Sequence, residues 1–143
     1  MRVYFAGTIM GDRRHLPAFQ RIVSHLQALG HSVPTAHVAR SRVLKEEDGN
    51  TAQQVYDRDV AWLRAAHCLV AEVSSPSLGV GYEICYALLS GVPCLCLYRA
   101  GVRLSKMILG CTETDMRVRP YQTEEEMLAL VDRFLQEVAL RRS

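Results

Sequence analysis

Two short runs in the middle of the chain, CLVAEV at 68–73 and PCLCLYR at 93–99, are almost wholly apolar. Strands of this kind are buried on both faces, as they are in a parallel sheet covered by helices on each side. Segments of helical periodicity separate them from each other and from a similar run, RVYFAG at 2–7. The alternation predicts an α/β fold with a parallel sheet between two layers of helices.

We expect five strands and four longer helices. The strands are placed at 2–7, 31–35 (the weakest), 68–73, 93–99 and 116–121, and the helices at 15–29, 51–66, 80–90 and 123–140. Gly30 and Gly91 stand where glycines end helices, and Thr123 with Glu126 fits a capping box. The polar stretch 40–50 is predicted to be a solvated loop, with a lid over a site as the alternative.

Length and composition limit the class of protein. The 143 residues contain no repeat or linker, so we expect a single domain spanning 1–143. The net charge of +2 comes from scattered basic residues, which argues against a nucleic-acid-binding face, and no apolar run approaches the roughly 20 residues of a membrane span. Five cysteines without a C-x-x-C pair indicate reduced core thiols in the cytoplasm or nucleus, and we expect no metal site.

Ligands of open parallel sheets bind outside the carboxyl ends of the strands, where the strand order reverses. Three loops lie there: GTIMGDRRH from Gly7, SSPSLGVGYE at 74–83 and RAGVRLSKM at 99–107. None matches a dinucleotide or P-loop motif. What remains is a candidate cradle for a small anion, with ordinary turn residues as the alternative; its members are Thr8, Gly11, Ser77, Gly79 and Gly81.

Two carboxylates are the candidate catalytic groups. Asp59 falls on the apolar stripe of its helix, where a carboxylate must be paired or employed; the alternative is that it only binds an arginine or a backbone amide. Glu83 is expected in the first turn of its helix, where the dipole favours the ionised form, unless it is merely a good first-turn residue. A protonated Asp59 and an ionised Glu83 would form the pair typical of glycosidic-bond hydrolases. Glu72, at the end of its strand, is a rival to Glu83.

Three other side chains fall near this end of the sheet. His37, in TAHVA, is a candidate substrate contact. Tyr4, in the first strand, could touch a sugar or Glu83. Trp62 is expected to be a core or interface aromatic rather than a stacking platform.

The segments VYFAGTI, TAHVA, YDRDVAWL, VAEVSSPSLGVGYE and RLSKMI, in this order and at these spacings, resemble the 2′-deoxynucleoside 5′-phosphate N-hydrolases, relatives of the nucleoside 2-deoxyribosyltransferases. The likeness covers nearly the whole chain. It implies a Rossmann-like (flavodoxin-like) three-layer sandwich with a five-stranded parallel sheet. It also implies a homodimer that needs no cofactor and cleaves the N-glycosidic bond of deoxynucleoside monophosphates.

The resemblance also implies roles for residues at matching positions. Glu83 would be the nucleophile of a covalent glycosyl-enzyme intermediate, Asp59 would assist departure of the base, and Tyr4 would orient Glu83 and crowd the 2′ position of the sugar. Ser105 would reach the 5′-phosphate from the partner subunit. Gly7, Thr8, Ser77 and Gly79 would hold the 5′-phosphate. The other residues that we expect to bind substrate are Ile9, Gly11, His37 and Met107.

One departure from the family pattern concerns the phosphate. After GTI the family usually carries an arginine and two small residues, whereas this chain has Met10, Gly11 and Asp12. Arg13 or Arg14 would have to replace the lost cation. Three alternative functions therefore stay open: a ribonucleotide hydrolase acting on cytidine monophosphate, a deoxyribosyltransferase, and a nucleotide-binding sensor without catalysis.

Overall fold

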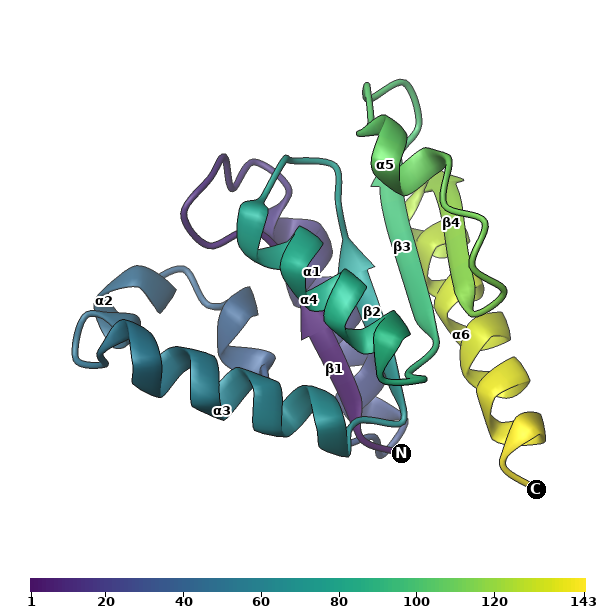
Figure 1. Cartoon of the computed structure of the whole chain (residues 1–143). Coiled ribbons are helices and arrows are strands. Elements are labelled where there is room, and N and C mark those ends of the chain that lie inside the picture. Colours follow the sequence, from purple (N-terminus) through teal and green to yellow (C-terminus); the bar gives the residue numbers. More distant parts are fainter.

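The computed structural model describes all residues from 1 to 143 (Figure 1). Strands and helices alternate as the sequence predicts. In chain order the elements are β1 (Val3–Ala6), α1 (Leu16–Ala28), the 3₁₀ helix η1 (Ala36–Ala39), α2 (Val43–Glu47), α3 (Ala52–Ala65), β2 (Cys68–Glu72), α4 (Leu78–Leu89), β3 (Cys94–Arg99), α5 (Lys106–Leu109), β4 (Met116–Tyr121) and α6 (Glu124–Arg141).

The strands form one parallel sheet in the order β1-β2-β3-β4. This confirms the α/β sandwich but corrects the strand count, because the expected strand at 31–35 is only an isolated bridge between Arg2 and Ser32. Pro34 has no backbone N–H to continue a ladder, and the side chain of Thr35 replaces the backbone by accepting a hydrogen bond from the Phe5 N–H at 2.8 Å. The chain then turns into η1.

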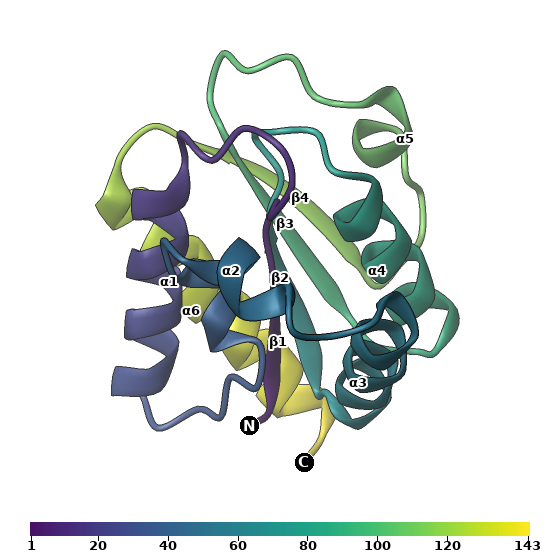
Figure 2. The same ribbon diagram turned by 90° about the vertical axis from the view of Figure 1, so that its left-hand side faces the viewer.

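The chain reverses direction across the sheet at β1. Ser32 pairs with one edge of β1, and after α3 the chain returns to pair β2 with the other edge. A crevice is expected at such a reversal, outside the carboxyl ends of β1 and β2. The loops that follow these two strands both lie at this end of the molecule (Figures 1 and 2).

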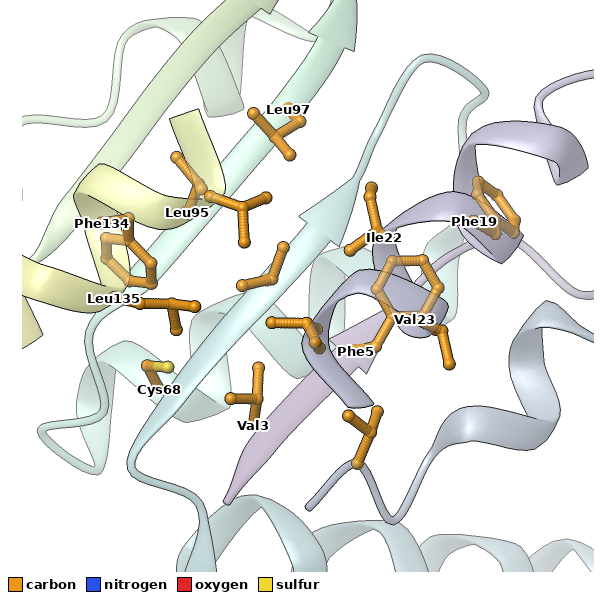
Figure 3. Close-up of a cluster of buried hydrophobic side chains, with 14 of the residues drawn as sticks. Val3, Phe5, Phe19, Ile22, Val23, Cys68, Leu95, Leu97, Phe134 and Leu135 are labelled. Carbon is orange, nitrogen blue, oxygen red and sulfur yellow. The ribbon is translucent and has the colours of Figure 1, made fainter. Parts of the chain in front are cut away.

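Two apolar cores hold the layers together. Helices α1 and α6 cover one face of the sheet, and α3 and α4 cover the other (Figure 2). On the first face Phe5 meets Phe19 edge to face at 5.5 Å, and Leu95 packs near Phe134 (Figure 3). Tyr4 points to the second face, so alternate residues of β1 serve different cores.

Helix ends follow the expected chemistry. Thr123 and Glu126 form the predicted capping box of α6, and Thr51 with Gln54 forms another at the start of α3. Gly30 and Gly91 adopt φ values of 79° and 73°, a left-handed conformation that glycine takes without strain. The capping box of Thr51 and Gln54 fixes where α3 begins, and therefore where Asp59 lies.

The polar stretch 40–50 is not simply a solvated loop. It contains α2, and Val43 within it is buried. Cys68, Cys94 and Cys96 are core thiols as predicted, but Cys85 is exposed on α4. No helix combines the length and apolar composition required to cross a membrane.

Candidate functional site

The loops after β1 and β2 touch at the strand-order reversal. Gly11 lies so close to the second loop that a Cβ there would stand 2.7 Å from Thr8 Oγ1 and 3.2 Å from the carbonyl oxygen of Pro76. Thr8 is buried, and its Oγ1 accepts a hydrogen bond from the Gly11 N–H at 3.0 Å. Only glycine allows this approach without displacing one of the loops.

Ser77 starts α4 at this junction. Its Oγ caps the helix by accepting from the Val80 N–H at 3.3 Å, and Gly79 follows in the first turn. The first N–H groups of an α-helix have no partner within the helix, so the start of α4 can bind an anion. Gly7 is packed against Phe19, with no room for a Cβ, and Ile9 packs partly into the α1 core.

The two arginines considered as replacements for the missing cation already have contacts. The guanidinium of Arg13 donates through Nη2 to the carbonyl oxygens of Val38 at 2.8 Å and Arg40 at 3.0 Å, and Arg14 pairs with Asp12. Backbone N–H groups and hydroxyls remain as donors to a phosphate, and Nη1 of Arg13 is buried without a partner.

Glu83 and Tyr4 form the central contact of the site. The Tyr4 hydroxyl donates to Glu83 Oε1 at 2.6 Å, joining β1 to α4. Burial raises the pKa of Glu83 to about 7, with a further rise from the charge of Asp59, and the bond from Tyr4 opposes the rise. Burial first, and the charge of Glu83 second, raise the pKa of the Tyr4 phenol, so Tyr4 remains a hydrogen-bond donor at neutral pH.

The expected protonation pattern is corrected at Glu83. Helix α4 begins at Leu78, so Glu83 lies in its second turn rather than its first, beyond the strongest influence of the helix dipole. Burial therefore has a larger effect on the pKa of Glu83 than the helix dipole has. Glu83, and not Asp59, is therefore the carboxylate in the apolar setting.

Asp59 lies on α3 and is paired. Its Oδ1 accepts from Arg58 Nε at 2.8 Å, and its side chain is 21% exposed. The arginine contact considered as an alternative is thus present, while Asp59 also lies close enough to raise the pKa values of both Glu83 and Tyr4. The structure brings Asp59, Glu83 and Tyr4 together from α3, α4 and β1.

His37 lies in η1 beside this group. Its Nε2 is 3.0 Å from Glu47 Oε1, and its ring is 6.0 Å from that of Trp62. Burial first, and the charge of Arg58 second, lower the pKa of His37, so the imidazole is neutral at pH 7. Trp62 is partly buried and packs against the α3–α4 core, as predicted.

Arg58 and Glu47 belong to the site but were missed by the sequence analysis. Arg58 Nη2 lies 3.0 Å from Glu47 Oε1, and its guanidinium lies over the Trp62 ring at 4.9 Å. Neighbouring residues on a helix point in different directions, so the spacing of Arg58 and Asp59 predicts no contact. Glu47 stands in the polar stretch and carries no motif, so the sequence gives no signal for its role.

Glu72 is a separate buried carboxylate. It shares the Cys68 and Val70 side of β2, facing the α1–α6 layer, and accepts from Tyr121 at 3.1 Å and from Ser74. Glu83 lies on α4, on the opposite face. Glu72 therefore does not compete with Glu83 for the same site.

Ser105 and Met107 lie apart from the carboxylates. Ser105 caps α5, and both residues line an apolar groove of about 610 Å³ between α4 and α5, together with Ser77 and Leu78. Neither Glu83, Asp59 nor Tyr4 lines this groove. Within one chain, the structure does not bring Ser105 to the carboxylates.

Known proteins are similar to this chain in sequence and in fold. The family profile described as nucleoside 2-deoxyribosyltransferase matches residues 3–128. A protein of Methanococcoides burtonii, provisionally named a 2′-deoxynucleoside 5′-phosphate N-hydrolase, is 43% identical over 119 residues, covering 83% of this chain and 98% of its own. The 5-hydroxymethyl-dUMP N-hydrolase of Mus musculus is 42% identical over 139 residues, covering 94% of this chain and 79% of its own.

A solved structure shares the fold at lower identity. The CMP N-glycosidase of Clostridium botulinum superposes with a TM-score of 0.68 at 19% identity, covering 92% of this chain and 99% of that one. At this identity the likeness concerns the fold alone. The family profile and the two closer relatives carry the assignment: this chain belongs to the nucleoside 2-deoxyribosyltransferase family.

Proposed function

We propose that the protein is an N-glycosidase that hydrolyses 2′-deoxynucleoside 5′-monophosphates to a free base and 2-deoxyribose 5-phosphate. The observation that carries the proposal is the 2.6 Å contact between Tyr4 and Glu83, beside a second carboxylate, Asp59. The N-hydrolase names of the M. burtonii and mouse relatives support the same reaction.

The reaction would proceed in two displacements at the anomeric carbon. The Glu83 carboxylate attacks this carbon as the N-glycosidic bond breaks, and the base leaves with the bonding electron pair. Asp59, in its protonated form, donates its proton to the departing base. Water then attacks the glycosyl ester and gives up a proton to the Asp59 carboxylate, which releases the sugar phosphate and regenerates the Glu83 carboxylate. Tyr4 holds Glu83 in place and occupies space at the 2′ position, which favours deoxyribose over ribose.

The 5′-phosphate would bind at the start of α4. Ser77 and Gly79 approach it from one loop, and Thr8 and Gly11 from the other. Backbone N–H groups and hydroxyls of the cradle donate to the phosphate, and Arg14 is already paired with Asp12. The base then extends toward Asp59 and His37.

The first test measures release of free base from a panel of deoxy- and ribonucleoside monophosphates, including 5-hydroxymethyl-dUMP, dCMP, dGMP and CMP. We expect release that requires the 5′-phosphate and is lost in Glu83→Gln, because the amide cannot form the ester. Asp59→Asn should slow release by about a hundredfold or more, in the range of general acid–base contributions. Asp57→Asn, an exposed neighbour on α3, is the matched control and should be unaffected.

Deoxyribosyl transfer is the second candidate, because the matching family profile carries the transferase name. Both reactions share the glycosyl-enzyme and differ in whether water or an added base resolves it. Incubation with a labelled free base separates them: incorporation of label without net hydrolysis favours transfer. Prompt cleavage of CMP would overturn the deoxy preference, and nucleotide binding without any turnover would favour a sensor.

We further propose that the protein is a homodimer in which Ser105 reaches the phosphate site of the partner subunit. The groove between α4 and α5 supports this, because apolar side chains around it are far more exposed than a monomer requires: Leu78 is 97%, Leu89 85% and Met107 84% exposed. A second copy of the chain would cover them, placing α5 of one subunit near α4 of the other.

Subunit mixing tests this arrangement. Glu83→Gln and Ser105→Ala should each impair the homodimer, but a mixed dimer would have one site with both residues intact. Co-refolded variants should recover about a quarter of wild-type activity, since half of the random dimers are mixed and each has one complete site. If a demonstrated mixed dimer shows no recovery of activity, Ser105 acts in the site of its own subunit. A protein that sediments as a monomer would contradict the proposal.

A further inference from the structure

Arg58 is the most highly connected charged side chain near the carboxylates. Its Nε lies 2.8 Å from Asp59 Oδ1, and its Nη2 lies 3.0 Å from Glu47 Oε1 and 3.4 Å from His37 Nε2. Its guanidinium also covers the ring of Trp62 at 4.9 Å. One cation therefore joins three segments: η1, α2 and α3.

The contact between Arg58 and Asp59 does not arise from α3 alone. Successive side chains on a helix diverge by about 100°, so residues i and i+1 do not normally pair. Trp62 stands one turn after Arg58, where a cation and an aromatic ring can stack, and Glu47 holds the far end of the guanidinium from α2. These two partners bend Arg58 back across the helix onto Asp59.

The buried position of Glu47 favours its contact with Arg58. Its side chain is only 16% exposed, and its Oε2 is buried without a hydrogen-bond partner. Because His37 is neutral at pH 7, Arg58 is the cation that compensates the Glu47 charge. Removing Arg58 would leave two carboxylates, Glu47 and Asp59, without their cation.

We propose that Arg58 is a positioning residue that, held by Glu47 and Trp62, aims the Asp59 carboxyl group at the departing base. This inference rests on the proposed N-glycosidase function. It couples α2, which makes no contact with Asp59 itself, to the leaving-group step. The charged and titratable groups around Arg58 are Asp59 on its own helix, Glu47 on α2 and His37 on η1; Glu83 and Tyr4 lie beyond Asp59.

The experiment compares two substrates in Arg58→Met, Arg58→Lys, Glu47→Gln and the double variant Arg58→Met/Glu47→Gln. One substrate is the best nucleotide of the panel. The other is the 4-nitrophenyl glycoside of 2-deoxyribose 5-phosphate, whose nitrophenolate leaves without assistance. The matched control is Glu46→Gln, a change next to Glu47 on α2 that breaks only the exposed pair of Glu46 with Arg40.

We expect Arg58→Met to lower kcat for the nucleotide by about ten- to hundredfold, a part of the general acid–base contribution, with KM little changed. Nitrophenolate release should stay near wild type, because that step does not need Asp59. Arg58→Lys should recover part of the nucleotide rate, since it keeps the charge but loses the fork. Glu47→Gln should lower the nucleotide rate severalfold, and the double variant should match Arg58→Met alone, because Glu47 acts through Arg58.

Three results would overturn the inference while leaving the proposed function intact. They are equal losses on both substrates, losses no larger than those of Glu46→Gln, or additive effects of the two single changes. If Arg58→Met fails to fold, the lysine and Glu47 variants decide the question by the same comparison. Failure of the proposed function would give a different result: the wild-type protein would release no base, and Glu83→Gln would not differ from it.

Discussion

At the scale of single residues, the candidate site depends on Glu83, a buried carboxylate whose ionisation costs free energy. As the proposed nucleophile, Glu83 must be ionised to attack the anomeric carbon, yet burial raises its pKa to about 7. The Tyr4 hydroxyl offsets part of this cost by donating to Oε1. A nucleophile with this pKa is available at neutral pH but retains the basicity that favours bond formation.

This predicts an acidic limb in the pH profile of kcat/KM. Activity should fall as pH drops through about 7, because protonated Glu83 cannot attack. Tyr4→Phe removes a bond that lowers the pKa of Glu83, so it should move the limb to higher pH as well as slowing the reaction. Initial rates across the pH range measure both effects. A limb near the ordinary glutamate value of 4.5, or a downward move in Tyr4→Phe, would contradict the assignment of Glu83.

At the scale of elements, the anion cradle depends on two loops packed against each other. Gly11 of the β1–α1 loop faces Thr8 and the carbonyl oxygen of Pro76 in the β2–α4 loop, with no space for a Cβ. The position of Ser77 relative to Thr8 is therefore set by one glycine. The carboxylates of Asp59 and Glu83 lie on α3 and α4, and Tyr4 lies on β1, away from this contact.

Gly11→Ala should consequently weaken substrate binding more than chemistry. We expect KM for the nucleotide to rise by about tenfold, equivalent to roughly 1.4 kcal/mol, with a smaller change in kcat. The control is Gly49→Ala, because nothing lies within 4 Å of a Cβ at that glycine. Steady-state kinetics distinguish the outcomes; an unchanged KM in Gly11→Ala would remove this loop from phosphate binding.

At the scale of the whole molecule, ionisation of the candidate site lowers the free energy of unfolding. The pKa of Glu83 is higher in the folded protein than its ordinary value of 4.5, so the folded state binds the proton more tightly than the unfolded state. This stabilisation is present below about pH 4.5 and is lost as pH rises through about 7. The pKa of Glu72 is raised by burial in the same direction.

Glu83→Gln should therefore stabilise the protein above neutral pH. We expect its free energy of unfolding to exceed that of wild type by up to about 3 kcal/mol near pH 8, and the difference to shrink toward about pH 4. Urea denaturation at both pH values measures this. Asp57→Asn serves as the control for removal of an exposed charge, and a stabilisation independent of pH would show that the Glu83 proton is not its cause.

Much of this architecture could be predicted from the sequence. The apolar runs at 68–73 and 93–99 become central strands because only burial on both faces suits them. The residues Tyr4, Asp59 and Glu83 meet because Tyr4 points to the face of the sheet that α3 and α4 cover. The strand at 31–35 failed for two reasons, of which the sequence shows one: Pro34 has no backbone N–H, whereas the role of Thr35 is visible only in three dimensions. Its hydrogen-bond partner on β1 is satisfied by the Thr35 side chain, so no ladder is needed.

The electrostatics of the site could not be predicted in the same way. The sequence placed Glu83 at a helix start and Asp59 on an apolar stripe, but the depth of burial depends on how closely β1 approaches α4. The pairing of Asp59 with Arg58 depends on Glu47, eleven positions before Arg58 and on another helix. Side-chain partners brought together by tertiary packing leave no periodic signal.

The contact between Thr35 and Phe5 also affects how the protein behaves in a crowded solution. β1 is an edge strand, and an unpaired edge is a template on which a second chain can add a strand and begin to aggregate. Ser32 pairs with the start of this edge, the Thr35 hydroxyl occupies the Phe5 N–H, and Pro34 between them can add no backbone donor. The segment that did not become a fifth strand thus hinders the addition of a foreign strand at the β1 edge of the sheet.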